Sequence, residues 1–293
     1  NAQEDKIYYV RQDGTGDFTS IQDGVNQVED GAVLIITPGV YNESVTVTDK
    51  TIRLIGTNRE KCIIMASAEN YHNIPLTIVA GMVSNLTIYG RNLSGEYIQS
   101  VSLNENTVYE WQDTFPGYAI HIDQDYSYGR ELIIDNCKVI SDSNQCVGIG
   151  CRGKSTIQIS NSELIANGQG GCIYLHNNSN PELDGDAQFI MKNCRLMNYK
   201  CPYIIALHSM GKSNPLYLTF ENVKASTVAY EDMTCYNTWN ANTWFDVRAL
   251  QSYAVKQYLQ ENGYYSAAAG QLLHTYSVAQ RRQFSASLQN NSL

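Results

Sequence analysis

The sequence predicts an all-β protein, a right-handed single-stranded parallel β-helix that forms one domain over residues 1–293. The main observation is a recurring phrase of alternating apolar residues, then Asn, then a small residue. It is clear around Asn136, Asn161 and Asn193 and weaker around Asn222 and Asn85. The steps between these asparagines are 51, 25, 32 and 29 residues, so we expect the first gap to hold two units.

A second strand recurs between these phrases, at residues 118–123, 145–150, 172–176 and 204–208. No helical segment separates the strands, so each coil can cover the apolar face of its neighbour. Asn suits the bend because it tolerates left-handed backbone angles, and its amide can bond to the same Asn one coil above. A β-sandwich is the alternative, but it needs frequent hairpin signals, and Asn-Gly occurs only at 167 and 262.

The first element is an N-terminal cap over 7–30. A strand at 7–10 leads into turn-forming residues 13–16, and Thr19 or Ser20 can cap a short helix that runs to about Val28. We expect this helix to close the open end of the solenoid. The coils follow over 32–230.

The coils are interrupted at 91–117, where the periodicity disappears. Loops that leave a solenoid usually line its binding groove. Trp111 and Tyr109 in this loop are therefore candidates for stacking on a sugar, although they can equally pack over the coil. Beyond the coils, two helices are expected over 246–261 and 266–283, with Asp246 and Ser266 as N-caps, and the tail from 285 is expected to be frayed.

Charge and hydropathy exclude several kinds of partner. The net charge is −9 and no basic cluster is longer than Arg281-Arg282, which argues against nucleic acid. No run approaches the roughly 18 apolar residues of a membrane span, so we expect a soluble protein. A charged fraction of 17% with 21 tyrosines is typical of an extracellular surface that meets sugars. Asn1 is not a natural start, so we expect an upstream segment such as a signal peptide, and a secreted or cell-surface location.

The eight cysteines do not require a disulfide framework, because a chain of this size can bury a large core. Cys137 and Cys194 occupy one slot of the repeated phrase, and Cys146 and Cys172 share a slot in the second strand. We interpret them as small buried residues stacked along the coil axis. No spacing supports zinc, and 184–186 lacks a complete calcium loop, so we expect no metal and no cofactor.

Residues 10–25, 36–43 and 52–56 resemble the opening of the pectin methylesterase family, within the pectin lyase-like superfamily. The resemblance implies a right-handed parallel β-helix and an esterase that acts on pectin. It also implies a mechanism in which one Asp attacks the ester carbonyl, a second Asp is acid and base, two Gln stabilise the oxyanion and an Arg holds the nucleophile.

These family residues are largely replaced here. Tyr118 stands where the first Gln is expected, whereas Gln145 is retained, and Cys146 occupies the position of the acid/base Asp. The strand 171–175 carries no nucleophilic Asp. No Leu-Gly-Arg-Pro-Trp motif occurs, and its nearest counterpart offers His208. Under this alignment both carboxylates are missing.

The alternation in the second strand predicts what replaces them. If the apolar residues point inward, two outward columns form. The first column is His121, Gly148, Tyr174 and Ala206, and the second is Asp123, Gly150, His176 and His208. The histidine cluster could supply a general base or metal ligands, or it could simply hydrogen-bond to solvent and neighbouring side chains. The small residues Gly148, Gly150 and Ala206 are expected to leave a shallow depression for a sugar ring.

The candidate residues follow from these columns and from the turn beyond Gly150, where Arg152 and Lys154 could meet a uronate carboxylate. We expect catalysis, if any, at His176, His208, Gln145 and Asp123. Substrate contacts are expected from His121, Tyr174, Tyr118, Trp111, Tyr109, Arg152 and Lys154.

Three functions remain open. The first is a secreted, monomeric, pectinesterase-like protein that binds or acts on pectin or another uronate-containing polysaccharide, with divergent or lost esterase activity. The second is a non-catalytic carbohydrate-binding or adhesion β-helix. The third is a polysaccharide lyase, for which His176, His208, Lys154 or Lys212 could be the base.

Overall fold

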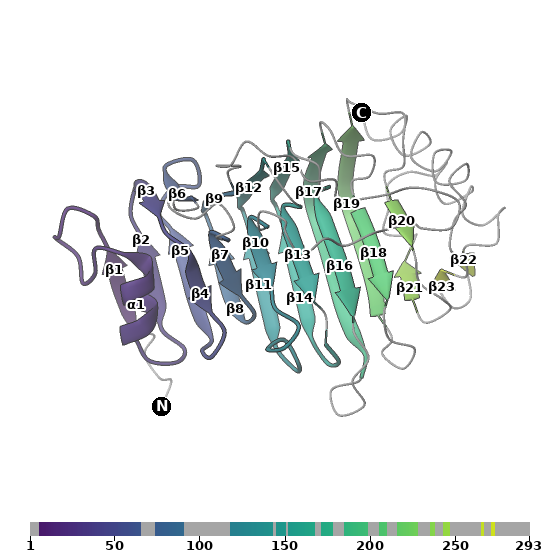
Figure 1. Ribbon diagram of the computed structural model, residues 1–293, viewed down its shortest axis with the longest axis horizontal. Coiled ribbons are helices and arrows are strands. Elements are labelled where there is room, and N and C mark those ends of the chain that lie inside the picture. The colour runs from purple at the N-terminus through teal and green to yellow at the C-terminus, as the bar shows by residue number, and fades with distance from the viewer. Residues whose placement is uncertain are drawn as a thin grey trace.

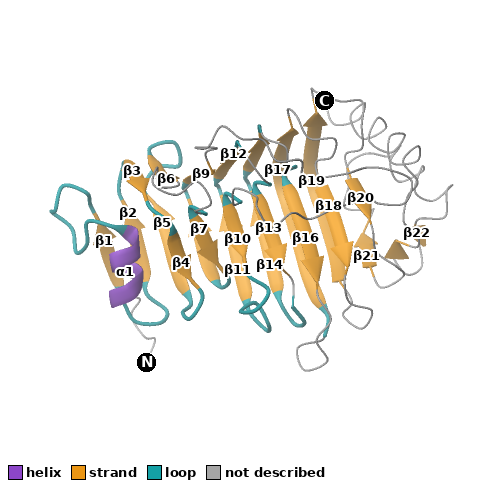
Figure 2. Cartoon of the chain, in the orientation of Figure 1, coloured by secondary structure: helices purple, strands orange, loops and turns teal. Residues whose placement is uncertain are grey.

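The computed structural model is a parallel β-helix, as predicted, with its strands stacked along the long axis of the molecule (Figure 1). It describes residues 6–65, 74–90, 118–142, 145–150, 152–167, 171–177, 185–198, 205–209, 216–227, 235–237, 243–246, 265–266 and 271–272. These residues are almost entirely strands and the turns between them, with one helix (Figure 2). No helix among them is long and apolar enough to cross a membrane.

Each coil contributes a strand to three faces, and the strands of one face pair in parallel from coil to coil. The first face contains β1 (Ile7–Val10), β2 (Val33–Ile36), β5 (Ile52–Gly56), β8 (Gly81–Ser84), β11 (Glu131–Asp135) and β14 (Thr156–Ser160). The second face contains β3 (Gly39–Asn42), β6 (Cys62–Met65), β9 (Thr87–Gly90), β12 (Lys138–Ser141) and β15 (Glu163–Ala166). Two long strands, β17 (Ala187–Asn198) and β19 (Leu216–Thr227), continue along both.

The third face is a separate sheet, called the third sheet below. Its strands are β4 (Val45–Val47), β7 (Leu76–Ile78), β10 (Ile120–Ile122), β13 (Val147–Gly150), β16 (Ile173–Asn177), β18 (Ile205–Ser209) and β20 (Cys235–Asn237). These are the recurring second strands of the sequence. The third sheet therefore carries His121, Tyr174, His176 and His208, four of the residues for which a functional role is predicted.

The N-terminal cap is built by α1 (Ile21–Gln27), with Ser20 as its N-cap, as predicted. The Glu43 carboxylate accepts hydrogen bonds from the backbone N–H groups of Ile21 and Gln22, both at 2.9 Å. The Gln22 side chain bonds both backbone groups of Thr46 on the edge strand β4. The helix thus satisfies polar groups that the first coil would otherwise leave exposed.

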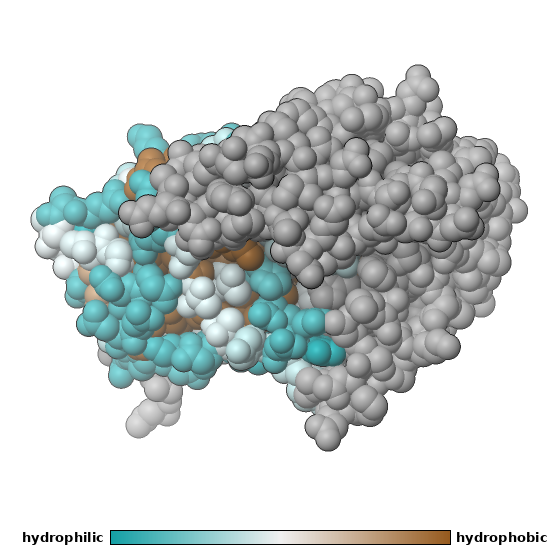
Figure 3. Space-filling model, in the orientation of Figure 1, coloured by the Kyte–Doolittle hydropathy of each residue, from teal (hydrophilic) through white to brown (hydrophobic). Residues whose placement is uncertain are grey.

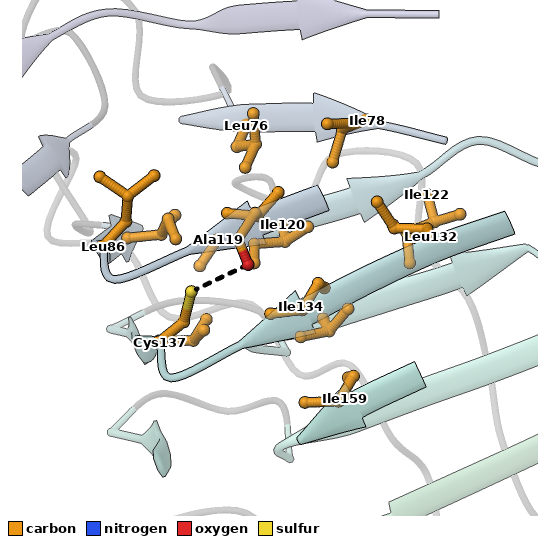
Figure 4. Packing of buried hydrophobic residues seen from close by; sticks show 14 of the residues in the cluster. Leu76, Ile78, Leu86, Ala119, Ile120, Ile122, Leu132, Ile134, Cys137 and Ile159 are labelled. Carbon is orange, nitrogen blue, oxygen red and sulfur yellow. Dashed lines mark hydrogen bonds between the residues drawn. The ribbon is translucent and has the colours of Figure 1, made fainter. Parts of the chain in front are cut away.

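The interior is filled by the inward members of each alternating strand. Figure 4 shows Ile120 and Ile122 of β10 among Leu132 and Ile134 of β11, and all four side chains are buried. Further along the axis, the rings of Phe189 and Phe220 meet edge to face with their centroids 6.0 Å apart. Period-two alternation therefore produces a continuous apolar column inside the coils.

The asparagines of the repeated phrase all bend the chain in the left-handed conformation, with φ between 49° and 55°. The side-chain amide of Asn136 donates to Asn85 and that of Asn222 donates to Asn193, each at 2.7 Å, which confirms the predicted ladder. Asn161 donates instead to Asp135 at 2.8 Å. The expectation of two units in the first gap is wrong, because β11 pairs directly with β8. The additional residues form an insertion within one coil.

The interpretation of the cysteines is confirmed for those whose side chains the structure describes. Cys62, Cys137, Cys146, Cys172 and Cys194 are free and buried. The Cys137 thiol donates to the backbone carbonyl oxygen of Val83, 3.6 Å away. Burial raises the pKa of Cys137 to about 12 and that of Cys194 to about 11. These thiols are therefore protonated packing groups at neutral pH.

Several expected elements lie wholly or mostly outside the described residues. The loop 91–117 is one of them, and most of the expected C-terminal helices, 246–261 and 266–283, is another. Where the structure does describe the C-terminal region, it shows the strands β21 (Thr243–Asp246), β22 (Tyr265–Ser266) and β23 (Gln271–Leu272). A helix through 266–283 is therefore wrong at Gln271–Leu272, because these residues pair in a sheet.

Candidate functional site

The outward positions of the third sheet align as the sequence predicts. His121 pairs with Gly148, Gly148 with Tyr174, and Tyr174 with Ala206. The same row continues toward the N-terminus through Thr77 and Thr46. We call these six register positions the outer column: Thr46, Thr77, His121, Gly148, Tyr174 and Ala206. In the space-filling view, hydrophobic residues show around β7, next to the hydrophilic N-terminal coils (Figure 3).

At the centre of the outer column, His121 packs against Tyr118, which lies just before β10. Their rings are stacked, with centroids 5.3 Å apart and planes 27° apart. The Tyr118 ring also lies across Gly148, where an added Cβ would be 2.6 Å from its ring carbons. The expected depression at Gly148 is therefore wrong, because the ring of Tyr118 fills the space that the glycine leaves.

Burial determines what these aromatic residues can do. Tyr118 is 8% exposed and Tyr174 is 6% exposed, so neither offers an open face for a sugar. Burial raises the pKa of both phenols, and in Tyr118 the neighbouring Tyr174 adds to the effect. Both hydroxyls stay protonated at neutral pH. The buried ring of Tyr118 stacks on the imidazole of His121 and holds it in place.

His121 remains partly exposed. Desolvation lowers its pKa below the ordinary value, and the charge of Asp123 opposes this shift only in part. The imidazole is thus neutral at neutral pH, with one nitrogen able to donate and the other able to accept a hydrogen bond. A neutral imidazole of this kind suits the hydroxyl groups of a sugar.

The second outward column is only partly described. Gly150 pairs with His176, and His176 pairs with His208 on the next strand, so the predicted neighbours are adjacent in register. The side chains of both histidines lie outside the described residues. The expected depression at Gly150 is wrong for the same reason as at Gly148, because an added Cβ would be 2.5 Å from Cβ of Gln124. Asp123 accepts the backbone N–H of Asp125 at 2.9 Å, which fixes the turn after β10.

Gln145, the retained glutamine, is fully buried. Its backbone carbonyl oxygen accepts the backbone N–H of Ala119 at 3.4 Å, beside Tyr118. Arg152 is also buried. Its guanidinium donates to the Gln124 carbonyl oxygen at 3.1 Å and lies 3.5 Å from the Asp125 carboxylate. In this conformation Arg152 ties two loops together, and its charge is already paired.

Lys154, by contrast, is exposed. Its ammonium lies 5.7 Å from the centre of the Tyr128 ring, and the backbone of Lys154 has a left-handed φ of 58°. The sequence reasoning did not single out Tyr128, or Tyr126, which is 52% exposed in the same turn. The sequence did contain a signal for them, because two tyrosines occur in the short polar segment 123–130, directly after a strand of the third sheet.

The outer column holds no carboxylate at its six register positions. No group of three or more potential metal-ligating side chains occurs within the described part of the chain. Trp111 and Tyr109 lie outside it. The described residues of this region thus bring together a neutral histidine and two buried tyrosines.

Comparison of the structure with solved structures finds pectin methylesterases. A pectin methylesterase from carrot matches over 84% of this chain and 72% of its own, with 12% identity and a TM-score of 0.49. Pectin methylesterase PemA from Erwinia chrysanthemi matches over 83% and 70%, with 16% identity and a TM-score of 0.45. A pectin methylesterase in complex with a hexasaccharide matches over 78% and 67%, with 17% identity and a TM-score of 0.45. The sequence matches no protein-family model and no curated protein.

Proposed function

We propose that the protein binds a pectin-like, uronate-containing polysaccharide along the accessible N-terminal half of the outer column of the third sheet and does not use a paired-carboxylate esterase mechanism. The observation that carries the proposal is the make-up of this column. It presents the neutral imidazole of His121, positioned by Tyr118, and has no carboxylate at any of its six register positions.

The geometry of the third sheet supports a linear ligand. Neighbouring strands of a parallel sheet are about 4.8 Å apart, so equivalent positions form a straight row across the coils. Thr46 is exposed and Thr77 and His121 are partly exposed, so the N-terminal half of the column is accessible. The resemblance of residues 10–25, 36–43 and 52–56 to the opening of pectin methylesterases supports pectin as the polysaccharide class. The proposal includes a secreted or cell-surface location and a monomeric state.

The proposal is tested by two measurements on the same preparation. Calorimetric titration with oligogalacturonates of free and methyl-esterified form should show binding, and incubation with methylated pectin should release no methanol. Appreciable methanol release would mean that a reactive pair of acids exists and that the alignment of the catalytic strands is wrong. If neither oligomer form binds, the polysaccharide proposal fails.

A variant locates the site. His121→Ala should weaken binding about threefold to tenfold, because it removes the imidazole hydrogen bonds, each of which contributes about 1 kcal/mol. Gln158→Ala is the matched control, since Gln158 is a partly exposed polar residue in the middle of β14 on the first face. Equal losses in both variants would place the site elsewhere. The paired variants His176→Ala and His208→Ala decide whether the second column takes part.

A further inference from the structure

The turns that follow the third sheet stack into a ridge beside the outer column. We define this ridge as residues 123–130, 152–155 and 185–186. The backbone N–H of Gly129 donates to Gly153 at 3.1 Å, and that of Lys154 donates to Asp186 at 2.8 Å. Successive turns are thus joined by backbone hydrogen bonds, so the backbone of the ridge is held in a fixed position relative to the sheet.

Lys154 occupies an unusual backbone position on the ridge. Among the described residues, six non-glycine residues have a positive φ, and the other five are the asparagines of the repeated phrase. A left-handed backbone is unfavourable for a side chain such as lysine, whereas Asn or Gly adopts it readily. Unfavourable backbone angles of this kind concentrate at functional sites. The conformation holds the exposed ammonium next to the Tyr128 ring.

None of the described acids around Lys154 forms an ion pair with its ammonium. No described carboxylate is within ion-pair distance of its ammonium. The nearby acids of the first turn have other partners, because Asp123 accepts a backbone N–H and Asp125 faces Arg152. Asp186 is exposed and contributes its backbone oxygen to Lys154. Tyr126, two residues before Tyr128, adds a ring that is 52% exposed.

We infer that this ridge recognises the free carboxylate of a uronate sugar, with Lys154 pairing with the carboxylate and Tyr126 packing against the sugar ring. The inference rests on the proposed function and specifies its ligand. A methyl ester has no negative charge to offer to Lys154. The protein therefore binds de-esterified stretches of the polysaccharide selectively, and the free acid binds more tightly than its methyl ester.

The test compares short oligogalacturonates in the free-acid and fully methyl-esterified forms, titrated calorimetrically at low and at high NaCl. The wild-type protein should prefer the free acid, and salt should reduce this preference. Lys154→Gln should lower affinity for the free acid about threefold, as expected for an exposed ion pair, and leave affinity for the ester unchanged. Tyr126→Ala should weaken both forms about fivefold, because ring packing does not depend on charge.

The N-terminal cap supplies matched controls. Tyr9 is 42% exposed and Arg11 lies 5.3 Å from the centre of its ring, so the same chemistry occurs away from the third sheet. Tyr9→Ala and Arg11→Gln should leave both affinities unchanged. If Lys154→Gln keeps the full preference for the free acid, the inference is overturned while the proposed function stands. If the wild type binds neither oligomer, the proposed function fails first.

Discussion

Two rows of residues run the length of the coils and differ in how they use repetition. The asparagine column, Asn85, Asn136, Asn161, Asn193 and Asn222, places the same residue, with nearly the same φ, at the bend between the first and second faces in five successive coils. The outer column places a different residue on almost every strand. At the bend, the backbone conformation itself selects the residue. On the sheet, the backbone at an outward position does not favour a particular residue, so the choice depends on a neighbouring side chain or a ligand.

This difference separates scaffold from site. A residue that is repeated in every coil indicates a structural requirement of the coil itself. A residue that changes from coil to coil indicates a requirement of its own surroundings. Gly148 shows that the local requirement can still be structural, because it makes room for the Tyr118 ring. His121 differs from Gly148: it stacks on Tyr118 but is also partly exposed, so one edge of its ring is open to a ligand. Substitutions in the interior, in the outer column and in the asparagine column test this separation.

The largest effect is expected in the interior. Phe189→Ala removes a fully buried ring that packs edge to face with Phe220, and it should lower the free energy of unfolding by about 3–5 kcal/mol. Tyr9→Ala, an exposed ring in the cap, should change it by less than about 0.5 kcal/mol. Urea unfolding followed by circular dichroism measures both. A cost below about 1 kcal/mol for Phe189→Ala would contradict the observed packing.

The next effect tests the structural part of the outer column. Gly148→Ala places a methyl group against the buried ring of Tyr118 and should cost about 2 kcal/mol through overpacking. In a Tyr118→Ala background the same change should cost much less, because the obstructing ring is gone. A double-mutant cycle of unfolding free energies measures this coupling. Additive costs would mean that Tyr118 does not occupy the space above Gly148.

An effect of similar size tests the asparagine column. Asn136→Ala should cost about 2 kcal/mol, because it forces a Cβ-bearing residue without a local polar group into the left-handed conformation and also removes the hydrogen bond to Asn85. Asn136→Gly keeps the conformation available and should cost about half as much. The comparison by urea unfolding separates backbone from side chain. Equal costs for the two variants would assign the whole role to the amide ladder.

The sequence predicted the scaffold well because its signals are local. Alternation determines which side chains are buried, and the left-handed bend favours Asn at one position per coil. The number of coils was harder to predict, because the spacing between Asn85 and Asn136 gives the number of residues and not the number of coils. An insertion lengthens the step without adding a coil, and β8 and β11 still pair directly.

The site was predicted only in part, for a different reason. The register of the outer column followed from alternation, and so did the adjacency of His176 and His208. The depression at Gly148 was wrong because a glycine indicates that space is needed but not what fills it. Tyr126 was missed because turns have no period, so exposure there depends on the three-dimensional path of the chain.

The smallest predicted effect concerns the protonation of His121. In the folded protein, burial lowers its pKa, so the unfolded chain, with a histidine pKa near about 6.5, binds the proton more readily. Stability should therefore fall as pH drops below about 6.5 toward the folded pKa, and the contribution of His121 should be fully present above about 6.5.

Replacing the imidazole by a non-titrating amide, His121→Gln, removes this contribution. Between pH 7.5 and pH 5.5 the wild type should lose more unfolding free energy than the variant, as measured by urea unfolding at each pH. Other titrating groups are common to both proteins and cancel in the difference. A larger loss in the variant would mean that the Asp123 charge, and not burial, dominates the environment of His121, and the neutral imidazole assigned to the outer column would then be wrong.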